Sequence, residues 1–225
     1  RDFTPYWSEN AFVVVYVSWS VAAAASSTRS PDGSAFARAA WIEAVRGDVE
    51  RGVELASQVR PGLRMSAGMS SVDVAVGLAV VDHARGRRAD AHRRLAEGIV
   101  AAAADGDLAT ESELLSHDCV IARRPESAKR LLGLIPRLDP AAPITRCFEL
   151  VATGVATDDH EAIAVAGDAY ASIGLVWQAA LVADAASDCA ERHGVRRAAT
   201  AHRAVAAGRR AQCTGLPGTS ATPTS

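Results

Sequence analysis

Three short stretches of this 225-residue chain hold side chains that could carry chemistry. The first is His117-Asp118-Cys119, which contains the residue types of a cysteine-protease site. Consecutive residues of a helix point about 100° apart, so these three cannot assemble a nucleophile, a base and an orienting group. The sequence therefore predicts a polar rim beside a buried cysteine, without a catalytic role.

The second stretch contains Cys189 and His193, whose i, i+4 spacing places both side chains on one face of a helix. A structural zinc ion needs four ligands, and the sequence offers no second Cys/His pair with suitable spacing. We therefore expect no metal and no cofactor.

The third stretch is the run of Asp158, Asp159 and His160, which could serve as an acid/base cluster in a helical enzyme. Asp158 followed by Glu161 also fits a helix-capping box, which needs no catalytic role. We expect the capping role and keep the enzyme as a third hypothesis. A GxxxxGK[ST] phosphate loop, HExxH, GxSxG and a GxGxxG after a strand are all missing from the sequence, which favours a protein that is not an enzyme.

Charge points to one further candidate surface. Lys and Arg number 24 against 26 Asp and Glu, so the net charge of -2 excludes a histone-like or polybasic protein. Arg196, Arg203 and Arg210 are nevertheless spaced by heptads and form a basic stripe on the last predicted helix, which could contact phosphates. The alternative is a solvated outer helix face, because no base-reading or stacking side chains accompany the stripe.

The elements that must position these residues are predicted to be helices. Ala and Arg, which are good helix formers, dominate the composition, and only 5% of the residues are aromatic. From about Ser34 onward the apolar pattern is helical and is interrupted by Gly, Pro and Asp. Pro125 suits a first helical turn, and Gly106 and Gly194 suit helix ends. Apolar residues between positions 72 and 81 occupy more than one side, which predicts an inner helix.

A repeat becomes visible when the predicted turns are compared. The segments 44–48 (AVRGD), 83–87 (HARGR) and 121–125 (IARRP) each close one helix and open the next, and they lie 39 and 38 residues apart. A more distant copy is 172–175 (SIGL), and a small residue follows several of the glycines by five positions: Gly52, Ala91, Ala179 and Ala199. Such residues let paired helices approach closely. The sequence therefore predicts an all-α fold, a degenerate tetratricopeptide-like α-solenoid of stacked antiparallel helix pairs.

This repeat domain is expected over residues 34–213. Residues 1–33 form an apolar N-terminal segment whose role stays open, and residues 214–225 are expected to be a disordered tail or linker. The run from Ala11 to Ala25 is too short for a membrane span and lacks the basic leader of a signal peptide. The four cysteines include no CxxC pair, which favours the cytoplasm, and Cys119 and Cys147 are expected to be buried.

The C-terminal half resembles the helical-repeat region of large LuxR-type transcriptional regulators. The resemblance rests on residues 154–194, above all on 168–174 (DAYASIG), 177–186 (WQAALVADAA) and 191–194 (ERHG), and extends more weakly over residues 35 to 215. In that family such a repeat lies between an ATP-binding module and a C-terminal helix-turn-helix. Neither the Walker loop nor the Leu-Thr-x-Arg-Glu opening of the DNA-binding domain is found in this sequence.

The resemblance implies a non-enzymatic, cytoplasmic scaffold for signal sensing and protein interaction, which would bind a protein segment or a small effector on its concave face. DNA would be contacted only through a domain outside this sequence, no membrane contact is expected, and a homo-oligomer is left open. The alternative is a free-standing tetratricopeptide-like adaptor protein, and the third hypothesis remains the small helical enzyme.

Overall fold

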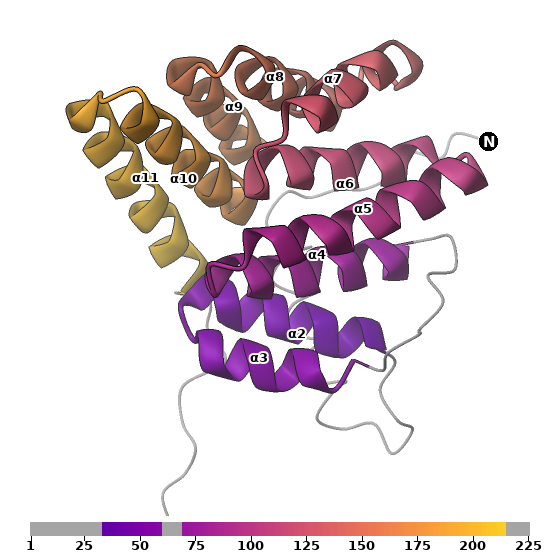
Figure 1. Cartoon of the computed structure of the whole chain (residues 1–225). Coiled ribbons are helices and arrows are strands. Elements are labelled where there is room, and N and C mark those ends of the chain that lie inside the picture. The colour runs from indigo at the N-terminus through magenta and orange to yellow at the C-terminus, as the bar shows by residue number, and fades with distance from the viewer. Residues whose placement is uncertain (1–32, 60–68, 215–225) are drawn as a thin grey trace, which may run out of the picture.

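The structure, a computed structural model, describes residues 33–59 and 69–214 of the chain (Figure 1). Over these residues the protein contains ten α-helices, one short 3-10 helix and no strand, so the prediction of an all-α fold is confirmed. In chain order the elements are α2 (Gly33–Arg46), α3 (Val49–Ser57), α4 (Met69–Ala84), α5 (Arg88–Asp105), α6 (Leu108–Ile121), α7 (Pro125–Leu134), η1 (Ile135–Arg137), α8 (Pro143–Thr157), α9 (His160–Ser172), α10 (Val176–Arg192) and α11 (Arg196–Thr214).

The helices pack in neighbouring pairs. Each even-numbered helix lies against the odd-numbered helix that follows it, and α2, α4, α6 and α8 also contact one another in sequence. Successive pairs start 36, 39, 35 and 33 residues apart, at Gly33, Met69, Leu108, Pro143 and Val176. Helix α10 contacts both α9 and α6, and α11 contacts α2, so the C-terminal pair lies beside the N-terminal pair (Figure 1).

The turn inside each pair contains one residue in the left-handed backbone region. Three of these are the glycines Gly47, Gly86 and Gly194, with φ of 96°, 75° and 73°. The other two are Arg123 and Asp158, with φ of 57° and 51°. A side chain in this conformation is disfavoured relative to glycine, so these two turns keep an arginine and an aspartate against a local preference. The predicted repeat segments do close one helix and open the next, as expected.

The capping box predicted for Asp158 is wrong by one residue. Asp159 is the N-cap of α9, and its carboxylate accepts a hydrogen bond of 2.8 Å from the backbone N–H of Glu161. Asp158 instead ends α8 in the left-handed conformation. Its carboxylate is therefore left to contact α10. The helix ends predicted at Gly106 and Gly194 and the first-turn Pro125 are confirmed.

Small residues hold the pairs together, as predicted. Ala91, Ala179 and Ala199 are buried, and a Cβ atom on Gly52 would lie 2.9 Å from the carbonyl oxygen of Ala40. Closer still is the contact of Gly77 in α4, where an added Cβ would lie 2.4 Å from the backbone oxygen of Ala37 in α2. These helices touch backbone to backbone.

Helix α4 is an inner helix, as its sequence predicts, since it contacts α2, α3, α5 and α6. Its valines at 72, 74, 76, 80 and 81 are all buried. Cys119 and Cys147 are buried as well, with 0% and 1% of their surface exposed. Among the helices in the described ranges, none is long and apolar enough to cross a membrane. The predictions for residues 1–32, including the apolar run, and for the tail after Thr214 lie outside the described residues.

Candidate functional site

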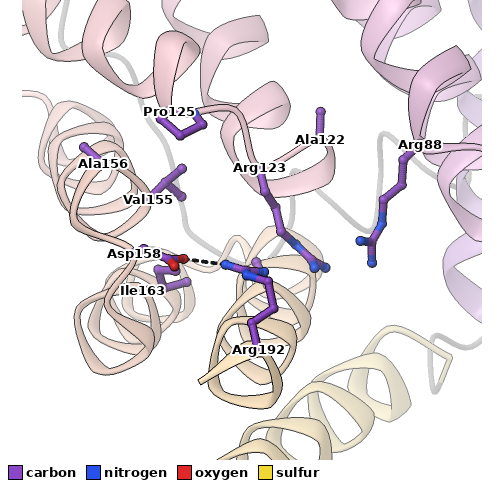
Figure 2. A pocket seen from close by; sticks show the side chains of 10 residues that line it. Arg88, Ala122, Arg123, Pro125, Val155, Ala156, Asp158, Ile163 and Arg192 are labelled. Carbon is purple, nitrogen blue, oxygen red and sulfur yellow. Dashed lines mark hydrogen bonds and ion pairs between the residues drawn. The ribbon is translucent and has the colours of Figure 1, made fainter. Parts of the chain in front are cut away.

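The turns of three consecutive helix pairs meet helix α10 around a pocket of about 380 Å³ (Figure 2). The volume is near the lower end of the range for small-molecule sites. Apolar side chains form part of the wall, and three arginines and one aspartate supply the polar groups. The lining residues are Arg88, Ala122, Arg123, Pro125, Val155, Ala156, Asp158, Ile163, Ala185 and Arg192.

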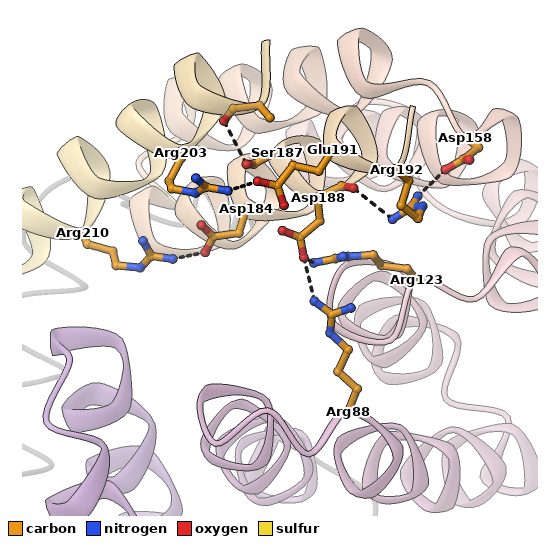
Figure 3. Close-up of polar contacts among 11 residues, drawn as sticks. Arg88, Arg123, Asp158, Asp184, Ser187, Asp188, Glu191, Arg192, Arg203 and Arg210 are labelled. Atoms are coloured by element: carbon orange, nitrogen blue, oxygen red, sulfur yellow. Dashed lines mark hydrogen bonds and ion pairs between the residues drawn. The ribbon is translucent and has the colours of Figure 1, made fainter. Parts of the chain in front are cut away.

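The three arginines come from three different elements. Arg88 is the first residue of α5, Arg123 lies in the turn between α6 and α7, and Arg192 is the last residue of α10. Asp188 of α10 lies between two of them, forming an ion pair of 2.6 Å with Arg88 and a second ion pair with Arg123 (Figure 3). Burial alone would raise the pKa of Asp188, but Arg123 and Arg88 lower it. Asp188 is therefore ionised at neutral pH.

Arg123 is the most enclosed of these cations. Only 11% of its side chain is exposed, and burial lowers its pKa, against the opposing effect of Asp188. Its Nε atom is buried and has no hydrogen-bond partner among the described residues. A buried, unpaired donor on a charged group is costly, by roughly 1–3 kcal/mol or more. Arg123, which lines the pocket, thus has a hydrogen-bond donor that the described residues do not use.

The arginines also affect His83, which lies near the end of α4. Burial lowers the pKa of His83 to about 4, and Arg123 and Arg88 contribute to the shift. Its imidazole is therefore neutral at pH 7. Three arginines and two aspartates, Asp158 and Asp188, leave one net positive charge in and around the pocket.

At one end of the pocket Asp158 contacts three residues of the last turns of α10. Its carboxylate forms an ion pair with Arg192 and lies 2.9 Å from Nε2 of His193. The thiol of Cys189 lies 3.3 Å from both the carboxylate oxygen Oδ1 and the backbone oxygen of Asp158. Burial opposes the ionisation of Asp158, but hydrogen bonds from His193, Arg192 and Cys189 lower its pKa to about 2.

The prediction of a polar rim at 117–119 is wrong, because His117 and Asp118 are buried like Cys119, but the three side chains do point to different partners. His117 stacks on Trp177 with ring centroids 5.3 Å apart, and burial lowers its pKa to about 4. Asp118 is fully buried and accepts hydrogen bonds from Ser127, at 2.5 Å, and from the ring of His92, at 2.7 Å. Burial raises the pKa of the Cys119 thiol. The structure does not assemble these residues into a nucleophile and base.

The residues of the third hypothesis also separate. Asp159 caps α9, Asp158 turns toward α10, and the ring of His160 lies 3.2 Å from that of His202 in α11. No shared acid/base cluster forms from 158, 159 and 160 in this part of the chain.

Two residues of the predicted basic stripe pair with acidic residues of α10. Arg203 forms an ion pair with Glu191, and Arg210 forms one with Asp184 (Figure 3). Arg196 lies exposed at the start of α11. The stripe therefore borders α10, and part of its charge is neutralised there.

Sequence reasoning missed Arg88, Arg123 and Asp188. In the repeat, Arg124 takes the place of the glycines of 44–48 and 83–87, so the missing glycine marked this turn, although the left-handed residue is Arg123, one position earlier. A residue other than glycine at a position that favours a left-handed backbone indicates strain, which concentrates at functional sites. The partner on α10 could not have been found this way, since Arg88 and Asp188 are 100 positions apart.

Comparison with known proteins adds no relative: no protein-family model, no curated protein and no solved structure matches this chain.

Proposed function

We propose that this chain is a non-enzymatic recognition scaffold, and that its arginine pocket binds the carboxylate or phosphate group of a protein segment or small effector. The observation that carries the proposal is Arg123, a buried guanidinium whose Nε lacks a partner among the described residues. A bound anion would supply the missing acceptor, and charge-assisted hydrogen bonds of this kind are among the strongest that proteins form.

The shape of the site favours a small anionic group. Arg88, Arg123 and Arg192 approach the pocket from three elements, so a ligand that enters it is held by several helix pairs at once. A planar guanidinium recognises carboxylate and phosphate oxygens through two parallel hydrogen bonds. Binding there would link α5, the α6–α7 turn and α10, which gives a route for a signal to pass between stacked pairs.

Two wider features belong to the same proposal. Helix pairs that start every 33 to 39 residues support a degenerate tetratricopeptide-like solenoid. The resemblance of residues 154–194 to LuxR-type regulators supports a role as the sensor and interaction region of such a regulator in the cytoplasm.

The mass of the native product in its source cells, detected with an antibody against residues 35–215, tests this context. A product several times heavier than 23.4 kDa supports the regulator, and a band near that mass supports the adaptor instead.

The pocket itself is tested by calorimetric titration of the full chain with citrate and with inorganic phosphate. Either anion should bind saturably, and the comparison of the two distinguishes carboxylate from phosphate preference. Arg88→Gln and Arg123→Gln should each weaken binding by about tenfold or more, because each removes a charged donor. Arg146→Gln is the matched control, since Arg146 is an exposed arginine paired with Glu149 on α8. Equal weakening by the control, or no saturable binding of either anion, would refute the pocket.

A further inference from the structure

The end of helix α8 and the end of helix α10 bring together three side chains that can each bind a metal ion. One carboxylate oxygen of Asp158, the Sγ of Cys189 and a ring nitrogen of His193 all lie within 4.8 Å of one another. Asp158 and Cys189 are 31 positions apart in the chain, so the cluster is a product of the fold. Cys189 is buried, and the other two residues are exposed to solvent.

The local backbone explains why Asp158 is available. Asp159 takes the capping role at α9, and the left-handed φ of 51° at Asp158 directs its carboxylate across to α10. On α10, Cys189 and His193 are one helical turn apart and face the same side. The two residues that sequence reasoning judged insufficient for a metal thus gain a third ligand from another helix pair.

We propose that Asp158, Cys189 and His193 form a zinc-binding site. Zinc–ligand bonds of about 2.0 Å to oxygen and nitrogen and about 2.3 Å to sulfur place tetrahedral ligand atoms roughly 3.3–3.5 Å apart. The Oδ1 atom of Asp158 lies 3.3 Å from Sγ of Cys189, and its Oδ2 atom lies 2.9 Å from Nε2 of His193. One ion between the three groups requires the ligand atoms, which lie within 4.8 Å of one another, to take up these separations.

The donor set selects the metal. A thiolate and an imidazole are ligands that favour zinc, whereas magnesium and calcium require oxygen ligands throughout. Three protein ligands leave one tetrahedral position for a water molecule, because His193 and Asp158 face solvent. The site is therefore of the open kind, and it shares Asp158 with the lining of the arginine pocket.

Zinc binding at this site is coupled to the release of one proton. The Cys189 thiol donates to the carboxylate of Asp158, so its sulfur carries a proton before zinc binds. When zinc binds, the S–H bond breaks, the proton leaves to solvent, and a Zn–S bond forms while bound waters leave the metal. The thiolate and the Asp158 carboxylate then balance the two charges of the ion.

Arg192 also contacts the carboxylate of Asp158. Its guanidinium pairs with that carboxylate and also donates to the backbone oxygen of Asp188 at 3.4 Å. A carboxylate can accept several hydrogen bonds, so Arg192 can hold the group in place while one oxygen binds the ion. Supporting partners of this kind are common around metal ligands.

The test is titration of the full-length chain with Co²⁺, followed by displacement with Zn²⁺. We expect one Co²⁺ per chain, the visible absorption of tetrahedral cobalt and a near-ultraviolet thiolate-to-cobalt band, all lost when Zn²⁺ is added. The Zn²⁺ affinity should rise with pH, because the Cys189 thiol must lose its proton to bind the ion. Calorimetry in buffers of different ionisation enthalpy should count that proton.

Cys189→Ser and His193→Gln are the decisive variants. Each should weaken Zn²⁺ binding by more than about tenfold, and Cys189→Ser should abolish the thiolate band. His193 is exposed, so its substitution leaves the fold intact even if Cys189→Ser does not. The control Cys213→Ser removes the half-buried cysteine of α11 and should retain the band. A thiolate band that disappears only in the control, or Zn²⁺ affinity equal in wild type and His193→Gln, would overturn the proposal.

Discussion

Trp177, in the first turn of α10, packs edge-on against Trp41 of α2, with ring centroids 4.0 Å apart. The same ring stacks on His117 of α6. One side chain thus joins the C-terminal pair to the first and third pairs. This aromatic cluster is therefore an apolar link between helices that are distant in the chain.

Trp177→Leu should therefore destabilise the protein as a whole. The substitution removes aromatic contacts worth about 0.5–1.5 kcal/mol each and leaves part of the space between α2 and α6 unfilled. We expect a loss of about 2–3 kcal/mol in urea unfolding, measured by far-ultraviolet circular dichroism. A double-mutant cycle with Trp41→Leu should show coupling. Additive effects of the two substitutions would mean that the rings do not stabilise each other.

The close approach of α2 and α4 makes a second prediction. A methyl group on Gly77 would meet the backbone of Ala37, which cannot move without shifting α2. Gly77→Ala should lower the free energy of unfolding by about 1–3 kcal/mol despite the better helix propensity of alanine. The control is Gly133→Ala in α7, where the added Cβ meets no atom within 4 Å. It should stabilise the protein by up to about 1 kcal/mol, and a stabilising Gly77→Ala would contradict the close contact.

These two contacts show what the sequence can and cannot predict. Helix positions and buried faces follow from local patterns, so the apolar sides of α4 are confirmed. The partners of polar residues depend on which pairs meet in space. On α10, Asp184 pairs with Arg210 of α11, whereas Asp188 pairs with Arg88 and Arg123. Local periodicity carries no information about such distant pairing.

These partners could not be predicted because α10 and α11 contact helices that are distant in the chain. A strictly linear stack would leave α11 far from α2, whereas the structure brings them into contact. Asp158 was predicted to cap α9, but the cap is Asp159, one position later. Asp158 is therefore free of this capping role and contacts another helix pair. Capping rules fix such positions only to within a residue or two.

The ion pairs of Asp188 lead to a third prediction. Asp188→Ala would leave the enclosed guanidinium of Arg123 without its carboxylate, so we expect a loss of about 1–3 kcal/mol in the free energy of unfolding. Salt should reduce the difference only weakly, because the pair is largely shielded from solvent. Glu149→Ala, which breaks an exposed pair with Arg146, should change stability by less than about 0.5 kcal/mol. A similar loss in both variants would indicate that enclosure adds nothing to the Asp188 pairs.

Glu113 of α6 gives the last prediction, which concerns pH. Burial raises the pKa of Glu113 to about 7, and the nearby Asp73 contributes. Below the unfolded value of about 4.3, the group is protonated in both states and costs nothing. As pH rises toward 7, the unfolded chain ionises first, so the stability associated with the neutral group is progressively lost.

Glu113→Gln keeps a neutral side chain at every pH and should therefore be more stable than wild type above pH 7, by about 1–2 kcal/mol given the partial exposure of the site. At pH 4 the two proteins should unfold at the same temperature. Thermal unfolding of both, measured in parallel from pH 4 to 8, isolates this group because His83 and His117 titrate equally in each. A constant difference in unfolding temperature across that range would show that folding does not shift the pKa of Glu113.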